Sequence, residues 1–488
     1  MKHSLDTLPF SNSLSKLTDT FYSRVQPTAF NSESYLIHFN AAAADLLDLN
    51  PDGSRNPDFT KIFSGQHLHQ QSDPIAMLYS GHQFGHYVEQ LGDGRAIMLG
   101  ETTNQLGQKW EIQLKGSGMT PYSRRADGRA VLRSSIREYL CSEAMHGLGI
   151  PTTRALCLIG NNDEVYREQI ETAAVVTRLA PSHIRFGSFE IFFYRSQLEH
   201  IKTLADFVIE NHYPALKNHT NPYIALLETV IKKTAQLIAH WQAVGFAHGV
   251  MNTDNMSILG LILDYGPFGF LDNYNPKFIC NHSDHEGRYA FENQPQIGLF
   301  NLSCLAQALL PLMDVESAKA ALSTYQDTYS HHYNELMAKK LGFNNPDATT
   351  ESLMESLLEQ MQQSEVDYTI FFRRLSNPES NQATELRDMF VDRKKFDQWL
   401  ANYTQHFEAL SLNIKDQQKI MLTLNPKYIL RNYIAQIAIE KAEREQDYSE
   451  IDKLMTLLQN PFAEHPEMEH YAGLPPDWAS RVSVSCSS

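Results

Sequence analysis

The chain has 488 residues, 42% of them hydrophobic, which is enough apolar material for two or three domains with buried cores. Its formal net charge is −16 at pH 7. Because nucleic acids and anionic membranes repel an acidic surface, this charge argues against either as the main partner.

The cysteines and the N-terminal residues point to a cellular compartment. Five cysteines lie far apart, with no C-x-x-C pair or His-rich spacing: Cys141, Cys157, Cys280, Cys304 and Cys486. This spacing argues against a structural zinc site and favours a reducing environment. The first residues hold no apolar run typical of a signal peptide, and no window is apolar enough for a membrane span. We therefore expect a cytoplasmic protein that is not bound to membranes, and a monomer.

The first predicted site element in chain order is L-G-D-G-R, Leu91 to Arg95. Its Asp-Gly pair predicts a turn between two strands, the second running from Arg95 to Leu99. Gly92 and Gly94 would let backbone N–H groups approach a phosphate closely, and Arg95 adds a positive charge. No G-x-x-x-x-G-K-[ST] motif occurs, so this is not a Walker loop. A plain hairpin turn is the alternative interpretation.

A strand and a helix follow this turn. Apolar and polar residues alternate in W-E-I-Q-L-K, Trp110 to Lys115, which predicts a half-buried strand ending at Lys115. Apolar residues then recur at helical spacing from Leu132 to Ala144. Glu138 lies within this helix and would hold Lys115 by an ion pair, as in protein kinases, where such a lysine contacts nucleotide phosphates. Taken singly, both residues would more commonly be surface charges.

Two polar segments surround a short apolar stretch further along the chain. They are H-G-V-M-N-T-D-N, which ends at Asn255, and I-L-D-Y-G, which contains Asp264. Protein kinases place their catalytic and metal-binding loops in this order. Asp254 would accept the proton of an attacking hydroxyl, while Asn255 and Asp264 would hold Mg²⁺ against nucleotide phosphates. The apolar run predicts a hairpin that brings Asp264 back beside Asn255. Ordinary turns are the alternative, because Asn and Asp are common in them.

These patterns divide the chain into three parts. Residues 1–190 would form an N-terminal extension and a small nucleotide-binding lobe, and residues 191–335 a large lobe with the catalytic and metal loops. Residues 336–488 predict a helical C-terminal extension with a mobile tail. The expected fold class is α+β, with a protein-kinase-like, two-lobed architecture.

Helical patterns occur in the last two parts. One surrounds Leu204 and Val208, and another leads up to Trp241. In the C-terminal part a helix is expected over Tyr428 to Glu443, because Pro426 precedes a long periodic stretch.

Long motifs between residues 79 and 274 make the chain similar to a known family. They are Y-S-G-H-Q-F-G-H (Tyr79 to His86), L-G-D-G-R, Q-L-K-G-S-G-M-T-P-Y-S-R-R-A-D-G-R-A-V-L-R-S-S-I-R-E (Gln113 to Glu138), T-R-L-A-P-S-H-I-R-F-G-S (Thr177 to Ser188), H-G-V-M-N-T-D-N-M and D-Y-G-P-F-G-F. With these motifs the chain resembles the selenoprotein O family, also called the YdiU family, protein adenylyltransferases with a kinase-like fold.

The resemblance implies transfer of AMP from ATP to Ser, Thr or Tyr hydroxyls of proteins, with release of pyrophosphate. In this family ATP is bound flipped relative to kinases, so that its α-phosphate faces the acceptor. By position, Asp254 matches the family's proton acceptor, and Asn255 and Asp264 match its ligands for Mg²⁺ or Mn²⁺. The residues that match the nucleotide site are Gly92, Gly94, Arg95, Lys115, Asp127, Gly128, Arg178 and Arg185.

Physical chemistry agrees with this assignment without selecting the reaction. A cluster of Arg178, Arg185, Lys115 and Arg95 would stabilise the charge that develops on departing pyrophosphate, and the arginine fork suits phosphate oxygens. Two other functions stay open: a protein kinase that transfers the γ-phosphate, and a non-catalytic pseudokinase module that binds ATP. The residues also leave open whether UTP replaces ATP, whether Mn²⁺ replaces Mg²⁺, and which hydroxyl is modified.

Two cysteines suggest redox control. Some members of the family carry selenocysteine near the C-terminal end, so Cys486 resembles that position. Cys280 follows D-Y-G-P-F-G-F, where a kinase has its activation segment. The hypothesis is that Cys280 and Cys486 form a disulfide under oxidising conditions and gate the site; two free thiols that never meet are the alternative.

Overall fold

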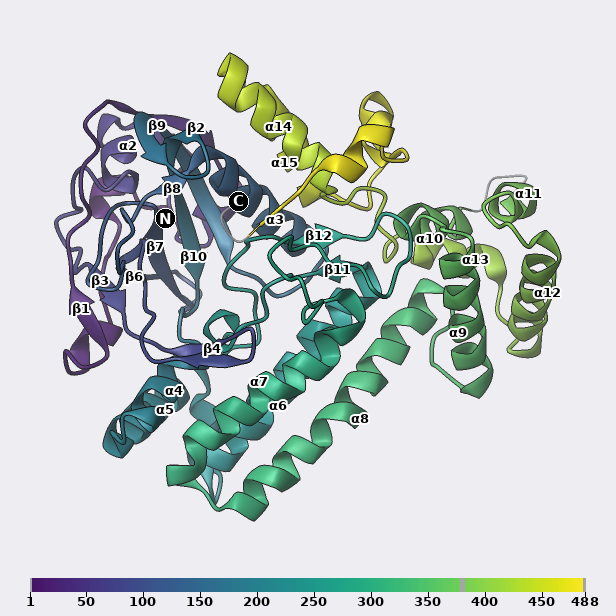
Figure 1. Cartoon of the computed structure of the whole chain (residues 1–488), viewed down its shortest axis with the longest axis horizontal. Helices are drawn as coiled ribbons and strands as arrows, with labels where there is room; N and C mark the ends of the chain where they lie inside the picture. Colours follow the sequence, from purple (N-terminus) through teal and green to yellow (C-terminus); the bar gives the residue numbers. More distant parts are fainter. Residues whose placement is uncertain (1, 378–381, 486–488) are drawn as a thin grey trace.

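A computed structural model of the chain describes residues 2–377 and 382–485. One part of the molecule holds an antiparallel β-sheet and the helix α3. A second part beside it holds the long helices α6, α7 and α8 (Figure 1). The strands are β1 (Tyr22–Arg24), β2 (Ser34–Phe39), β3 (Ile75–Met77), β4 (Gly81–Gln83), β5 (His86–Val88), β6 (Ala96–Thr103), β7 (Lys109–Lys115), β8 (Ala130–Val131), β9 (Arg154–Tyr166), β10 (Ile170–Ala180), β11 (Phe246–Ala247) and β12 (Gly269–Phe270).

The described chain also contains α-helices and 3₁₀ helices. The α-helices are α1 (Ala41–Asp45), α2 (Pro57–Phe63), α3 (Leu132–Gly147), α4 (Gly187–Tyr194), α5 (Leu198–His212), α6 (Pro222–Val244), α7 (Gln294–Leu309), α8 (Val315–Lys340), α9 (Ala348–Gln363), α10 (Tyr368–Leu375), α11 (Gln382–Arg387), α12 (Arg393–Ala409), α13 (Ile414–Met421), α14 (Asn432–Glu445) and α15 (Ser449–Gln459). The 3₁₀ helices are η1 (Leu5–Thr7), η2 (Leu14–Lys16), η3 (Pro51–Arg55), η4 (Pro214–Asn218), η5 (Thr253–Asn255), η6 (Phe291–Asn293), η7 (Leu310–Leu312), η8 (Pro466–Ala472) and η9 (Asp477–Arg481).

The main sheet has the strand order β1-β3-β6-β7-β10-β9-β2, with β8 paired to β10. Its pairings are antiparallel, and Lys115 at the end of β7 lies opposite Ala96 of β6 and Val176 of β10. Strands β7 and β10, which carry Lys115 and Arg178, and β6, which directly follows Arg95, are therefore neighbours in the middle of the sheet. This class, α+β with a mainly antiparallel sheet, is the one expected from the sequence.

Strand β7 is buried on both faces, so the prediction of a half-buried strand was wrong. From Glu111 to Lys115 every residue is buried. Residues of η1 and α2 pack against Ile112 and Leu114 on one face, while Gln113 on the other has polar partners inside the protein. The alternation in W-E-I-Q-L-K therefore separates an apolar face from a face with buried polar partners. Polar side chains can be buried in this way because hydrogen bonds offset the cost of removing them from water.

The segment Leu91 to Arg95 lies between two strands, β5 and β6, and β6 covers most of the second strand expected there. It does not join two paired strands, because β4 and β5 form their own small hairpin and β6 pairs with β3 and β7. The Asp93 carboxylate accepts a hydrogen bond from the Met77 backbone N–H at 3.0 Å, which holds the turn against β3. A long-range contact, invisible to local turn preferences, thus decides its conformation.

Helix α3 packs against helices from the C-terminal part of the chain. The helix predicted from Leu132 onward is α3, and its buried residues Ile136, Tyr139 and Leu140 belong to the largest apolar core. Helices α14 and α15 pack against α3 (Figure 1). The C-terminal part of the chain therefore supports the helix that carries Glu138.

Helix α14 begins at Asn432, four residues later than predicted from Pro426. Tyr428, Ile429 and Leu430 are buried in non-helical conformation, and Arg431 is anchored to Asp272 and to Asp367, the latter at 2.9 Å. The tertiary ion pairs override the helical periodicity of this stretch.

Helices α5 and α6 confirm the two helical patterns expected in the middle of the chain. Helices from α8 to α13 enclose a second apolar core that includes Phe371, Phe396 and Trp399. The division at residues 190 and 335 stays a prediction; residue 335 lies inside α8.

Candidate active site

A cavity of about 530 Å³ lies between the ends of β6, β7 and β10 and the loops of residues 250–264. All eleven residues that the sequence assigned to the nucleotide, the metal and proton transfer line this one cavity: Gly92, Gly94, Arg95, Lys115, Asp127, Gly128, Arg178, Arg185, Asp254, Asn255 and Asp264. Residues separated by up to 172 positions thus share a single site.

The lining of the cavity carries more positive than negative charge. Its cationic side chains are Arg95, Lys115, Arg124, Arg129, Arg167, Arg178 and Arg185. Its carboxylates are Asp93, Asp127, Asp254 and Asp264. Seven cations against four carboxylates, on a chain with a net charge of −16, make this cavity a local site of attraction for a polyanion such as a triphosphate.

A four-residue ionic network forms the floor of the cavity. Lys115 Nζ donates to Glu138 Oε2 at 2.5 Å and to Asp264 Oδ1 at 2.7 Å. Arg178 donates from Nε to Glu138 Oε1 and from Nη2 to Asp264 Oδ1 at 2.6 Å. Two cations and two carboxylates therefore alternate, and the ion pair expected between Lys115 and Glu138 is formed.

The network sets the protonation of its members. Burial opposes ionisation of Asp264, but the adjacent Lys115 and Arg178 cations hold its pKa well below the usual value. Burial, and then the Arg178 charge, lower the pKa of Lys115. Asp264 is thus ionised, which is the state that a metal ligand needs.

Glycines bring the backbone close to the cavity. Gly92 has φ +107°, and a Cβ there would lie 2.5 Å from the Tyr122 ring. Gly128 has φ +70°, and a Cβ there would lie 2.2 Å from the Gly118 backbone. Neither position tolerates a side chain, so both loops keep main-chain N–H groups near the site.

Asp127 is held by a cation that the sequence analysis did not assign. Its carboxylate accepts two hydrogen bonds from the Arg167 guanidinium, at 2.8 and 2.9 Å, and one from the Arg129 backbone N–H. Burial raises and these hydrogen bonds lower its pKa, with a net decrease. Asp127 therefore orients Arg167 at the rim of the cavity.

Arg185 ties the loop after β10 to the loop that carries Asp254. Its Nη1 donates to the Asp254 backbone oxygen at 2.9 Å, and its guanidinium lies over the Tyr79 ring at 4.4 Å from the centroid. Its Nη2 is 4.0 Å from Asp93 Oδ1. These contacts fix a buried arginine beside the expected proton acceptor.

Asp254 has the environment of a general base. It is 8% exposed, and burial raises the pKa of its carboxyl to about 6. Oδ2 accepts a hydrogen bond from Gln83 Nε2 at 3.2 Å, whereas Oδ1 has no partner among the described residues. A buried carboxylate that lines the cavity and has a raised pKa can take a proton from a hydroxyl placed there.

Asn255 lies beside Asp264, as the predicted hairpin required. An antiparallel bridge between Met256 and Ile262 turns the chain back. The side chains of Asn255 and Asp264 therefore line the same cavity. Asn255 Nδ2 donates to the Val250 carbonyl at 3.0 Å, which directs Oδ1 away from that carbonyl. A carboxylate and an amide oxygen side by side form the oxygen-rich donor set that Mg²⁺ and Mn²⁺ prefer.

Sequence reasoning missed several residues of the site. Gln83 and Phe84 lie in Y-S-G-H-Q-F-G-H, a motif quoted for the resemblance but given no role, and Phe84 has the unusual φ of +49°. Buried Glu111 accepts hydrogen bonds from the backbone N–H and Nδ1 of His183, at 2.7 and 2.8 Å, and so holds the loop that carries Arg185. A strained bulky residue and polar residues in an apolar strand are the signals that could have found them.

Comparison with known proteins gives the family. The sequence profile described as "Protein adenylyltransferase SelO" matches residues 4–459. The chain belongs to the SelO family. A Thioalkalivibrio sulfidiphilus relative named "Protein nucleotidyltransferase YdiU" is 53% identical over 493 residues, covering 100% of both chains. Relatives of the same name from Thiobacillus denitrificans and Myxococcus xanthus are 54% and 50% identical over 99% of each chain. The enzyme class of this SelO chain is therefore nucleotidyltransferase.

The expected redox pair is described only in part. In this SelO chain Cys280 is buried, with its thiol 3.4 Å from the Ala247 carbonyl oxygen. Cys486 lies outside the described residues. The chain just before it runs along the segment of Cys280, since the His282 backbone N–H donates to the Val484 carbonyl at 2.8 Å.

The helices of the described part of this SelO chain include none with the length and apolar character needed to cross a membrane.

Proposed function

We propose that the chain is a protein adenylyltransferase with a kinase-like, two-lobed fold that transfers AMP from ATP to Ser, Thr or Tyr hydroxyls of proteins and releases pyrophosphate. The observation that carries the proposal is the convergence of all eleven assigned residues on one cationic cavity. Membership of the SelO family supplies the reaction class.

The transfer step is a substitution at the α-phosphorus. The oxygen of the acceptor hydroxyl forms a bond to that phosphorus, the bond to the bridging oxygen of the β-phosphate breaks, and pyrophosphate leaves with the electron pair. The hydroxyl proton passes to the Asp254 carboxylate, which lines the cavity and whose raised pKa suits proton acceptance near neutral pH. Gln83 holds Oδ2 and thereby orients the carboxylate.

The cations of the cavity stabilise the leaving group. Lys115 and Arg178 face the cavity from adjacent strands, and Arg185 faces it from the loop after β10. Guanidinium groups bind phosphate oxygens with two parallel hydrogen bonds, so they stabilise charge that moves onto pyrophosphate during transfer. Glu138 keeps Lys115 and Arg178 in place by binding both.

Asn255 and Asp264 would hold the Mg²⁺ or Mn²⁺ ion of the reaction. When bound, the ion neutralises phosphate oxygens and orients them for in-line attack. The fit rests on the ionised Asp264 carboxylate and on the Asn255 amide held by Val250. Uridylyl transfer from UTP is part of the same proposal, since the cavity residues named above contact phosphates and do not select a base.

Two further functions of the same cavity are separated by one experiment. ATP labelled at either the α- or the γ-phosphate is incubated with the protein and with a lysate, beside an Asp264→Ala variant. Label retained only from the α-phosphate, and lost in the variant, supports AMP transfer. Label from the γ-phosphate would instead favour a protein kinase, and no label from either would favour a non-catalytic ATP-binding module.

The remaining expectations from the sequence belong to this proposal. They are the three-part division at residues 190 and 335, a monomeric state, a cytoplasmic location, and no nucleic-acid or membrane partner. Size-exclusion chromatography with light scattering tests the monomer.

A further inference from the structure

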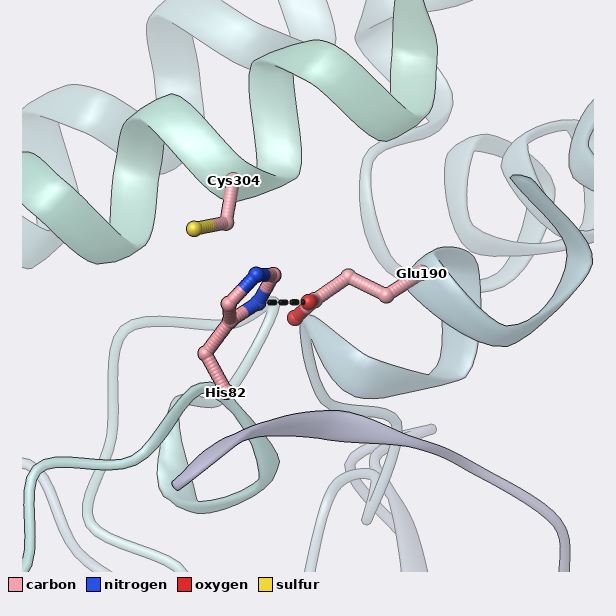
Figure 2. A group of neighbouring side chains, drawn as sticks. All are labelled: His82, Glu190 and Cys304. Carbon is pink, nitrogen blue, oxygen red and sulfur yellow. Dashed lines mark hydrogen bonds and ion pairs between the residues drawn. The ribbon is translucent and has the colours of Figure 1, made fainter. Parts of the chain in front are cut away.

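Three side chains from separate elements lie close to one another (Figure 2). His82 lies on β4, Glu190 on α4 and Cys304 on α7. Each offers an atom that binds metals, and these atoms lie within 4.8 Å of one another. His82 Nδ1 and Glu190 Oε2 are 2.6 Å apart. His82 comes from the Y-S-G-H-Q-F-G-H motif, and the proposed transfer reaction gives it no role.

The burial of this cluster leaves one oxygen without a partner. Glu190 is 0% exposed, and within the described residues its Oε1 accepts no hydrogen bond. An unpaired oxygen on a buried carboxylate is costly. Cys304 is also buried, and Figure 2 shows its thiol and the Glu190 carboxylate on either side of the His82 ring. A cation in this space would supply the partner that the oxygen lacks.

We propose that His82, Glu190 and Cys304 bind a Zn²⁺ ion. The thiolate and the carboxylate together balance the two positive charges, so the buried site becomes neutral when the ion enters. The Cys304 thiol releases its proton to solvent as the sulfur–zinc bond forms, and the imidazole binds as a neutral ligand. Three protein ligands leave a fourth position for water, a common arrangement for zinc.

The donor atoms select zinc over the ions of the candidate active site. Thiolate sulfur and imidazole nitrogen favour Zn²⁺, whereas Mg²⁺ and Mn²⁺ favour oxygen. Zinc bonds of about 2.0–2.3 Å require ligand atoms about 3–4 Å apart. Side-chain rotations would therefore have to separate His82 Nδ1 from Glu190 Oε2, now 2.6 Å apart, and adjust a cluster that spans up to 4.8 Å.

Aromatic rings surround the histidine. The centroids of Tyr87, Tyr194 and Phe300 lie 5.4, 6.0 and 5.9 Å from that of His82. Rings on these sides limit the rotation of the imidazole and reduce the access of water, and both effects favour a fixed metal ligand.

The site is connected to the loop that carries Asp254. The His82 backbone N–H donates to Thr253 Oγ1 at 2.7 Å, and the next residue of β4, Gln83, donates to the Asp254 carboxylate. Zinc would thus join β4 to α4 and α7 and hold the strand that orients the proton acceptor. The ion would touch no reacting atom.

Cobalt substitution tests the site on the whole protein. Chelator-treated, reduced protein is titrated with Co²⁺, and the thiolate-to-cobalt charge-transfer absorption is recorded. We expect this absorption in the wild type, its loss on adding one equivalent of Zn²⁺, and its absence in Cys304→Ser. Glu190→Gln should keep the absorption at saturation but weaken Co²⁺ binding about tenfold or more.

Two matched variants separate this site from others. Cys141→Ala removes a buried cysteine of α3, and Asp264→Ala removes an oxygen ligand of the candidate active site; both should keep the absorption. Circular dichroism confirms that Cys304→Ser is folded. A wild type without the absorption, or a folded Cys304→Ser variant that retains it, would overturn the proposal.

Discussion

Lys115 Nζ lies 2.7 Å from Asp264 Oδ1, so the cation expected to hold phosphate and the carboxylate expected to hold metal are bound to each other. Arg178 contacts the same oxygen at 2.6 Å. The two ligand-binding groups thus neutralise one another before any ligand arrives. Binding of a nucleotide with its metal has to exchange this ion pair for new ones, which couples the affinities of the two ligands.

This coupling predicts the behaviour of Lys115→Met. The variant should bind ATP about 10–100-fold more weakly, because it loses a charge-assisted contact to phosphate. It should bind Mg²⁺ alone more tightly, because Asp264 loses a competing cation. Isothermal titration calorimetry measures both affinities. Lys109→Met is the matched control, since Lys109 lies on the same strand but binds Ser13 and Asn211. Parallel losses of both affinities would contradict the coupling.

The role of Asp254 predicts a loss of chemistry without a loss of binding. Asp254→Asn keeps the size of the side chain but cannot accept the hydroxyl proton. Transfer from α-labelled ATP should fall about 10²–10⁴-fold, the usual contribution of a general base. ATP affinity, measured on the same preparation, should change little. Transfer at the wild-type rate would remove Asp254 from the mechanism.

Gln83 is predicted to act by positioning Asp254. Gln83→Leu removes the 3.2 Å hydrogen bond to Oδ2 of Asp254. Losing this bond should raise the activation free energy by about 1–1.5 kcal/mol and so lower kcat about tenfold. The KM for ATP should stay unchanged, since the nucleotide phosphates are held by other residues. Gln90→Leu provides the control, because Gln90 accepts a hydrogen bond from Arg195 and does not line the cavity. A changed KM with an unchanged kcat would assign Gln83 to nucleotide binding instead.

The Glu111–His183 pair predicts a pH dependence of stability. Burial raises the pKa of Glu111 from 4.5 to about 8 and lowers that of His183 from 6.5 to about 3. Between pH 4.5 and 6.5 Glu111 is protonated only in the folded state, and His183 is protonated only in the unfolded state. The two groups therefore change the free energy of unfolding with pH in opposite directions. Between pH 6.5 and 8 only the Glu111 contribution remains, and it is lost as the pH rises.

Glu111→Gln isolates this contribution, since glutamine resembles the neutral acid at every pH. The difference in free energy of unfolding between wild type and variant should decline from pH 6.5 to 8, by at most about 1.4 kcal/mol per pH unit. Urea-induced unfolding at both pH values measures it. The exposed Glu33→Gln serves as the reference and should show no such decline. A constant difference for Glu111→Gln would mean that this carboxyl is ionised throughout.

The Cys280 and Cys486 hypothesis predicts a disulfide under oxidising conditions. Val484 pairs with His282, so the chain approaches Cys280 two residues before Cys486. Mild peroxide followed by non-reducing peptide mapping should yield a Cys280–Cys486 peptide and change the transfer activity, and a reductant should reverse both. Cys157→Ser is the control, because it leaves both cysteines in place. Mapping without the cross-linked peptide would end the hypothesis.

Local patterns indicated which residues would carry the proposed chemistry. The spacing of Asp254, Asn255 and Asp264, the strand that ends at Lys115 and the helix that contains Glu138 were all predicted from the sequence. They could be predicted because a proton acceptor, metal ligands and a phosphate-binding cation impose short, recognisable spacings on adjacent elements. The choice of AMP over γ-phosphate came from the family resemblance, since both reactions use the same residue types.

Tertiary structure alone decided how these residues are supported. The half-buried character predicted for β7 and the start predicted for α14 were wrong, and the strands on either side of Leu91 to Arg95 do not pair as a hairpin. Distant partners such as Met77 and Asp367 hold these segments. The sequence also argued against a structural zinc site, since its five cysteines lie far apart and form no C-x-x-C pair. The proposed zinc ligands come together only on folding, when β4, α4 and α7 pack and bring His82 close to Glu190 and Cys304. These residues span 222 positions, and no local periodicity in the sequence predicts such a contact.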